Sequence, residues 1–188
     1  MALFVFPTLP TIAGSLESGD ASYERCALCH GLFGVSSHPK FPHLAGQNHH
    51  YLEQQLARFL DGTRTNDGGQ MQSVVTEISA AEFAVVVDWF ASQESPEPTE
   101  LPHETGAALF TNAGCQQCHK NDQGNGEGVP LLYSQHKAYL AKQMRDYRDG
   151  IRKTENESEK RVRLKSLSND EIDAIAQHLA SLSRMDER

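Results

Sequence analysis

The four cysteines of this 188-residue chain all belong to one repeated pattern. Each copy reads Cys-x-x-Cys-His, and its residues are Cys26, Cys29 and His30 in the first copy and Cys115, Cys118 and His119 in the second. On a helical turn this spacing places both thiols on one side, where they can add to the two vinyl groups of a haem. The histidine that follows can then ligate the iron as its proximal ligand. The pattern therefore predicts two covalently bound haem c groups.

Other uses of four cysteines are a zinc site, a redox pair of thioredoxin type and two structural disulfides. A thioredoxin motif does not require the histidine, and a zinc site would not require it in both copies. Because the histidine follows both cysteine pairs, we favour haem attachment.

The charge and hydropathy of the chain exclude two classes of partner. With 17 Lys and Arg against 25 Asp and Glu, the net charge of −8 argues against nucleic acid binding. No apolar run approaches the roughly 18 to 20 residues of a membrane helix, so we expect no membrane span. Residues 1–103 hold 4 basic and 12 acidic residues, whereas residues 104–188 hold 13 of each. The acidic half is the expected docking end for a basic partner.

The N-terminal segment, residues 1–16, is apolar but differs from a complete signal peptide. No basic residue precedes Arg25, although a secretory leader begins with positive charge. We interpret the segment as the remnant of a leader, a replaced start or a disordered end. Haem c is attached outside the cytoplasm in bacteria, so the prediction of a periplasmic or otherwise exported protein depends on the haem motifs.

The chain is a tandem duplication. An offset of 89 residues aligns the two haem motifs and also aligns Ser79 with Ser168, while an offset of 88 aligns residues 42–64 with residues 130–152. Helical spacing predicts three helices in each repeat and no strand, which makes the fold all-α. The first helix ends at the haem motif, the second covers about 51–60 and 139–148, and the third covers about 80–92 and 169–182.

Local signals support these helices and divide the chain into domains. Ser79 and Ser168 are N-cap candidates, each with a glutamate three residues later, as in a capping box. Gly106 permits close crossing of the first helix with another. Three prolines between the repeats predict a stiff linker. The expected division is leader 1–16, first domain 17–93, linker 94–103, second domain 104–183 and tail 184–188.

Over about residues 17–183 the sequence resembles dihaem class I c-type cytochromes of the cytochrome c4 family. The resemblance rests on the paired haem motifs, on the stretch from Pro42 through Arg64 and on the closing helices. It implies two all-α cytochrome c domains that face each other with haem propionates near the interface, and a periplasmic electron shuttle. It also implies that the carbonyls of Pro42 and Pro130 accept hydrogen bonds from the proximal imidazoles. Four arginines are candidate propionate partners: Arg58, Arg64, Arg148 and Arg152.

The distal iron ligand of the first haem is expected to be Met71. It lies in a glycine-containing segment, predicted to be a flexible loop, seven residues before Ile78, where the resembling family has its methionine. A thioether ligand favours ferrous iron and raises the potential. The alternative is a methionine that only fills the core. Four nearby histidines, predicted to lie at the surface, are weaker candidates: His38, His43, His49 and His50.

In the second repeat the corresponding position is Lys160, within a run of charged residues. Lysine ligates iron only as the neutral amine, and losing its proton at pH 7 costs roughly 4 to 5 kcal/mol. Alternatives are a solvated surface lysine with a five-coordinate or water-bound iron, or ligation by another side chain. The other side chains considered are His136, His178 and Met144. His178 and Met144 are expected to be packing residues on helices. A further methionine, Met185, lies in the expected tail.

Every strong motif serves haem attachment, which predicts an electron carrier and no catalytic residue. The expected partners are a redox donor and acceptor, such as a terminal oxidase, a reductase or a secreted oxidative enzyme. The alternative function is a ligand-binding sensor or haem enzyme that uses an open or displaceable sixth position in the second domain.

Overall fold

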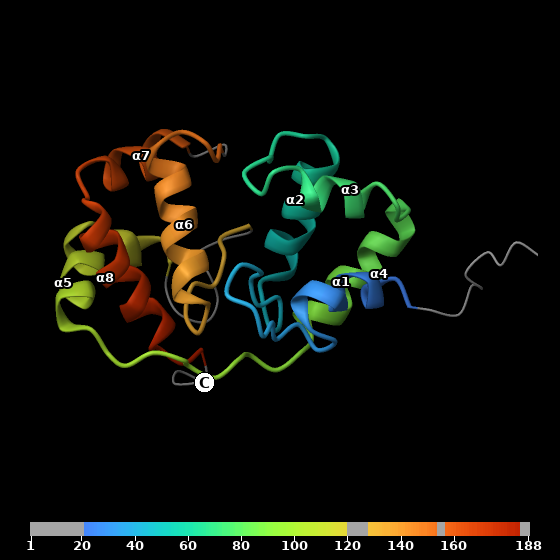
Figure 1. Ribbon diagram of the computed structural model, residues 1–188, viewed down its shortest axis with the longest axis horizontal. Helices are drawn as coiled ribbons and strands as arrows, with labels where there is room; N and C mark the ends of the chain where they lie inside the picture. Colours follow the sequence, from blue (N-terminus) through green and yellow to red (C-terminus); the bar gives the residue numbers. More distant parts are fainter. Residues whose placement is uncertain (1–20, 120–127, 154–156, 185–188) are drawn as a thin grey trace, which may run out of the picture.

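The structure is a computed structural model that describes residues 21–119, 128–153 and 157–184. Within these ranges the chain contains helices and no strand, which confirms the all-α prediction. The first body contains α1 (Tyr23–His30), α2 (His49–Leu60), α3 (Gln70–Val75) and α4 (Ala80–Ala91). The second contains α5 (Glu104–Asn112), the 3₁₀ turn η1 (Cys115–Gln117), α6 (Lys137–Arg148), α7 (Glu157–Lys165) and α8 (Asn169–Ala180). Figure 1 shows the two bodies side by side, with α2 and α6 on the sides that face each other.

Each body has a hydrophobic core built from the same positions of the repeat. In the first, α2 packs on α4, and in the second, α6 and α5 pack on α8. Val86 and Phe90 of α4 are 3% and 1% exposed, and Ile175 and Leu179, which lie 89 residues later on α8, are 1% exposed each. The apolar faces predicted from helical spacing are therefore buried between the helices, where the burial of apolar surface stabilises the fold.

The local signals of the sequence also act as predicted. Ser79 and Ser168 both form capping boxes, with Glu82 and Glu171 returning a bond to the cap backbone. A Cβ atom on Gly106 would lie 2.0 Å from the carbonyl oxygen of Ala174, so only glycine lets α5 approach α8 this closely.

The prediction of three helices per repeat was wrong, because each body has a further short helix. α3 forms in the segment expected to be a flexible loop, where the carboxylate of Asp67 accepts from the backbone N–H groups of Gly69 and Met71 at 3.1 and 2.6 Å. α7 forms in the charged run, with Lys160 and Leu164 one turn apart on the side that faces the interior cavity. The second haem motif also departs from prediction: α5 ends at Asn112, before the motif, which forms η1.

Residues 92–103 connect α4 to α5 without a helix, and Figure 1 shows this segment running along one side of both bodies. It is attached to the second body where the backbone N–H of Thr99 donates to the carbonyl of Ala180. The leader 1–16, most of the tail 184–188 and Met185 lie outside the described residues. No helix in the described part of the chain is long and apolar enough to cross a membrane.

Candidate haem-binding site

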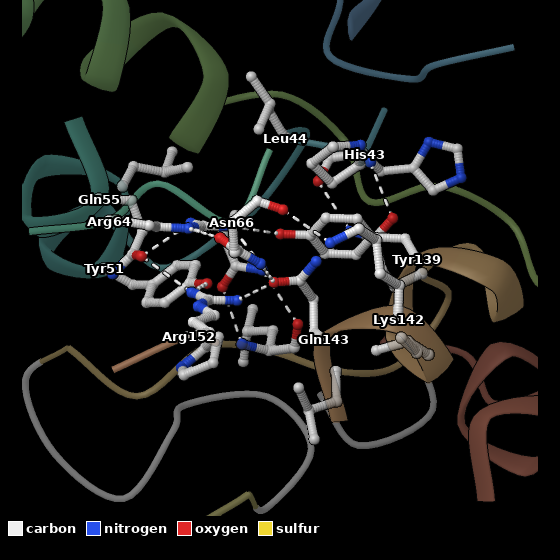
Figure 2. A pocket seen from close by; sticks show the side chains of 18 of the residues that line it. His43, Leu44, Tyr51, Gln55, Arg64, Asn66, Tyr139, Lys142, Gln143 and Arg152 are labelled. Atoms are coloured by element: carbon white, nitrogen blue, oxygen red, sulfur yellow. Dashed lines mark hydrogen bonds between the residues drawn. The ribbon is translucent and has the colours of Figure 1, made fainter. Parts of the chain in front are cut away.

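A cavity of about 500 Å³ lies between the two bodies and is lined by residues of both. Figure 2 shows the polar side chains that cross it. The residues predicted to bind haem all line it: Cys26, Cys29, His30, Pro42, Met71, Cys115, Cys118, His119, Pro130 and Lys160. The fold thus brings together the two motifs, both distal candidates and both prolines around one interior space.

On the proximal side, each motif histidine faces a proline carbonyl. His30 Nδ1 lies 2.9 Å from the oxygen of Pro42, and His119 Nδ1 lies 3.3 Å from the oxygen of Pro130. Because a carbonyl only accepts, Nδ1 carries the proton in both rings and Nε2 has the lone pair that a metal requires. Burial lowers the pKa of His30, and it lowers the pKa of His119 to about 4, against the raising effect of the proline carbonyls. Both imidazoles are therefore neutral.

None of the four cysteines forms a disulfide. Burial raises the pKa of Cys26 to about 11 and also raises that of Cys115. At neutral pH these two thiols are therefore in their protonated form. In the described part of the chain no three histidine, cysteine or carboxylate side chains gather as a metal site.

On the distal side, Met71 and Lys160 come from equivalent helices, α3 and α7. Met71 packs against the first core and is half-buried. The Lys160 Nζ lies 5.3 Å from the centre of the Tyr147 ring, and burial lowers the pKa of this amine. The lysine predicted as part of a charged run therefore points into the interior, in an environment that favours its neutral form.

The structure separates two of the three other distal candidates, His136 and His178, from the site. His136 Nε2 donates to the carbonyl of Ser36 at 3.0 Å across the interface, and the β-carbon of His178 lies close to Gly106; neither ring lines the cavity. Met144 does line the cavity, but it occupies the helix position of Leu56 in the first repeat and packs against the second core.

The prediction that four histidines of the first repeat lie at the surface holds for His38 and His49 and, in part, for His50, which is half-exposed. It was wrong for His43, which is 3% exposed. Its ring contacts that of His136, with centroids 3.9 Å apart and the ring planes tilted by 32°, because this segment forms the domain interface instead of an open loop.

Two arginines cross the interface in a reciprocal arrangement, visible in Figure 2. Arg64 of the first body donates to Tyr139 Oη of the second at 3.1 Å, and Arg152 of the second donates to Tyr51 Oη of the first at 3.0 Å. Each also donates to glutamine oxygens on α2 and α6, those of Gln55 and Gln143. Their side chains are thus fixed at the cavity wall by both bodies.

These two arginines provide a test of whether the cavity suits a haem. Arg64 and Arg152 are 6% and 3% exposed, and their hydrogen-bond partners in the described part of the chain are amide and phenol groups, with no carboxylate among them. Arg152 Nε has no hydrogen-bond partner there. Two buried cations without an anion favour an anionic ligand between them, as haem propionates would be. Arg58 also lines the cavity, whereas Arg148 does not: it donates to Leu167 and Asp149 instead.

Comparison with known proteins agrees with this geometry. The cytochrome c family model matches residues 103–183. Cytochrome c4 of Pseudomonas aeruginosa is 34% identical over 183 residues, which cover 90% of either chain. The chain belongs to the cytochrome c4 family. It is accordingly an electron-transfer protein with two covalently bound haem c groups.

Two further relatives show how far the likeness extends. The crystal structure of reduced recombinant cytochrome c4 from Pseudomonas stutzeri aligns with a TM-score of 0.75 at 30% identity, covering 88% of this chain and 100% of that one. A protein of Thiomonas intermedia named thiosulfate dehydrogenase electron acceptor is 31% identical over 142 residues, 68% of this chain and 64% of that protein. The first confirms the predicted pair of all-α cytochrome c domains.

Sequence reasoning missed the polar residues that join the bodies: Gln47, Gln55, Asn66, Gln135, Tyr139 and Gln143. A signal for them was present, because the 88-residue offset pairs glutamine with glutamine at two positions and tyrosine with tyrosine. Polar residues that are identical in the two repeats indicate a contact between the two domains, because a single domain has no such contact to make.

Proposed function

We propose that this protein is a periplasmic carrier that passes single electrons between redox partners through two haems with different distal ligands. The first haem would be held by His30 and Met71, and the second by His119 and Lys160. The observation that carries the proposal is the position of Lys160, which lines the cavity from the helix equivalent to that of Met71. The periplasmic location is supported by the haem motifs, because haem c is attached outside the cytoplasm.

The residues of this chain prepare two unlike sites. The proline carbonyls orient both proximal imidazoles and keep Nε2 unprotonated. Burial of Lys160 reduces the cost of presenting a neutral amine, which is roughly 4 to 5 kcal/mol for an unperturbed lysine at pH 7. When bound, each haem supplies a one-electron couple whose potential the axial ligands set within about 0.8 V.

The unlike ligands give the carrier a direction. A nitrogen ligand favours ferric iron more than a thioether does, so the site with Lys160 should have the lower potential. Electrons would then enter through the second domain and leave through the first. A redox titration with two overlapping waves would argue against this direction.

Near-infrared magnetic circular dichroism of the fully oxidised protein tests the ligand assignment. One band of His/Met type and one of His/Lys type are expected. Two His/Met bands would show that the second distal segment is misassigned, with Met144 the remaining candidate that lines the cavity.

A second candidate function is reversible binding of a small molecule at the second haem. It is favoured by the contact of the Lys160 amine with the Tyr147 ring, which offers the amine a resting place away from a metal. Rapid binding of carbon monoxide to the reduced protein, with a high-spin signal in the oxidised protein, would support this function. Slow or absent binding would argue against this second function and support electron transfer as the only function.

The docking end for a partner is proposed on the first body. Leu28, between the two cysteines of the first motif, is 89% exposed, and Phe33, five residues later in the chain, is 58% exposed and contacts Trp89. In the second motif the position of Leu28 is occupied by Gln117. Together with the acidic charge of this half, the patch fits a redox protein whose apolar contact surface is surrounded by basic residues.

Electron exchange with a small redox protein of high isoelectric point tests this docking end. L28N should slow the exchange at least several-fold, because it removes an apolar contact without adding charge, and added salt should slow exchange by the unmodified protein. V162N, on a valine that is 72% exposed in the second body, is the matched control and should change the rate little. Equal slowing by both variants would place the docking end elsewhere. The name of the Thiomonas intermedia relative supports an enzyme donor as one class of partner.

A further inference from the structure

The peptide group that follows each proximal proline is bonded on both sides. In the first body, the carbonyl of Pro42 accepts from His30 Nδ1, and the N–H of the same peptide group belongs to His43. That N–H donates to Oε1 of Gln135, which belongs to the second body, at 2.8 Å. A single peptide group therefore lies between the proximal histidine of one domain and a glutamine of the other.

The same arrangement occurs in the opposite direction. The carbonyl of Pro130 accepts from His119 Nδ1, and the N–H of Leu131 in the same peptide group donates to Oε1 of Gln47, in the first body, at 2.8 Å. The sequence offset of 88 relates Gln47 to Gln135 and Pro42 to Pro130. In each half, a glutamine therefore bonds the peptide group next to the proximal histidine of the other half.

Each glutamine is fixed by more than this one bond. Nε2 of Gln135 donates to the carbonyl of His43 at 2.9 Å, and Oε1 also accepts from the N–H of His136 at 3.0 Å. Nε2 of Gln47 donates to the carbonyl of Leu131 at 3.0 Å, and its Oε1 accepts from the N–H of Asn48 at 2.9 Å. Since backbone N–H groups only donate, the orientation of both amides is determined. The two glutamine side chains are 5% and 4% exposed.

Hydrogen bonds on the two ends of one amide strengthen each other, because each polarises the group further, and the effect is larger where water is excluded. Donation from the His43 N–H to Gln135 therefore makes the Pro42 carbonyl a better acceptor. A better acceptor draws the Nδ1 proton of His30 away from the ring and makes Nε2 more electron-rich. A more electron-rich nitrogen stabilises ferric iron relative to ferrous iron.

We propose that Gln135 and Gln47 are positioning residues that act crosswise: each tunes, through one peptide group, the haem of the domain to which it does not belong. Gln135 lowers the potential of the first haem, and Gln47 lowers that of the second. The proposal rests on the assigned proximal ligands His30 and His119 and does not depend on either distal ligand.

Potentials of the two haems in the variants Q135L and Q47L test the proposal. The haems are distinguished by NMR of the full-length dihaem protein, through the contacts of their thioether substituents with Cys26 and Cys29 or with Cys115 and Cys118. Q135L should raise the potential of the first haem by about a threefold change in its equilibrium constant, or about 28 mV, and that of the second by much less. Q47L should do the reverse.

H136N is the control for the loss of an interdomain bond. It removes the donation to Ser36, substitutes one neutral side chain for another, and places asparagine at the helix N-cap, as Asn48 is placed in the first body. It should leave both potentials nearly unchanged. If Q135L or Q47L fails to fold, Q135N and Q47N retain a polar amide that is one methylene too short and should give smaller crosswise shifts.

Three results would overturn the proposal: shifts confined to the haem of the substituted domain, equal shifts of both haems, or no shift while the interdomain bond is lost. A failure of the proposed function is distinguishable from these, because it would appear in the unmodified protein. There, covalent haem would be missing from one motif, or a histidine other than His30 or His119 would show the proximal resonances.

Discussion

The distal segments of the two bodies occupy the same place in the repeat but differ in length and chemistry. α3 has six residues, begins at a turn organised by Asp67 and presents a thioether, whereas α7 has nine residues, is rich in charge and presents an amine. The proximal prolines, the interface glutamines and the reciprocal arginines are the same in both. The comparison shows that these residues in the contact between the bodies are the same in both repeats, whereas the residues of the distal segments α3 and α7 differ. The two halves therefore differ in chemistry on the distal side.

The largest effect is expected from removing this difference. K160M gives the second body the side chain of the first, and the potential of its haem should rise by a sizeable part of the roughly 0.8 V range that axial ligands control. Potentiometric titration should then show two waves that lie closer together, with a second His/Met band in magnetic circular dichroism. An unchanged titration would show that Lys160 does not ligate.

The reciprocal arginines test the part of the comparison that is symmetric. R152M should lower the free energy of unfolding of the dihaem protein by about 3 kcal/mol, because buried groups on both bodies lose a charged partner. R64M should cost about as much. Denaturant unfolding measures both, with R148M as a control. Arg148 forms an exposed ion pair with the neighbouring Asp149, so this substitution should cost much less. Very different costs for R152M and R64M would contradict the symmetry.

His43 and its repeat counterpart Leu131 differ in their response to pH. Burial lowers the pKa of His43 to about 4, together with the charge of Arg184 and the repulsion that protonated His136 or His30 would exert. The folded state therefore binds fewer protons than the unfolded state, in which histidine titrates near 6.5, and stability is lost as pH falls from about 6.5 to about 4. The loss attributable to this group is about 3 kcal/mol.

H43L makes the two positions alike and should flatten the pH dependence of the unfolding free energy over that window. The backbone N–H that bonds Gln135 is retained, so the interface should persist. An equally steep dependence in the variant would assign the effect to other groups, His136 first.

The smallest effects concern the capping boxes. S79A and S168A should each lower the unfolding free energy by about 1 kcal/mol, because each leaves a helix N-terminus without its side-chain acceptor. The caps lie on separate bodies, so the double variant should show the sum, measured by thermal or denaturant unfolding. A strongly non-additive double variant would show that α4 and α8 are coupled through the interface.

The sequence predicted the parts of this structure that local chemistry determines. Ser79 and Ser168 begin helices because their hydroxyls satisfy local N–H groups, and Gly106 marks a close crossing because no other residue fits. Met71 was proposed from the family resemblance and Lys160 from the repeat offset, and both line the cavity together with the motif residues.

Features that depend on the other body were not predictable in this way. His43 was expected at the surface, because the sequence of its own segment does not show that it packs against His136 of the other body. The helical state of α7 was missed because its strongly charged sequence has no apolar face of ordinary width, and only Leu164 is buried among the side chains described. Tertiary contact, which the sequence of one segment does not contain, decided both outcomes.

The bonds of the interface are reciprocal, as in the isologous contact of a two-fold homodimer. Arg64 of the first body bonds Tyr139 of the second, and its repeat counterpart Arg152 bonds Tyr51 of the first. The bonds of Gln135 and Gln47 are related in the same way. In separate chains such a contact would dissociate on dilution. Residues 92–103 convert it into an intramolecular contact, for which short linkers provide effective concentrations in the millimolar range. The spacing of the two redox centres is consequently independent of how much protein is present, even where a carrier must leave one partner and travel alone to the next.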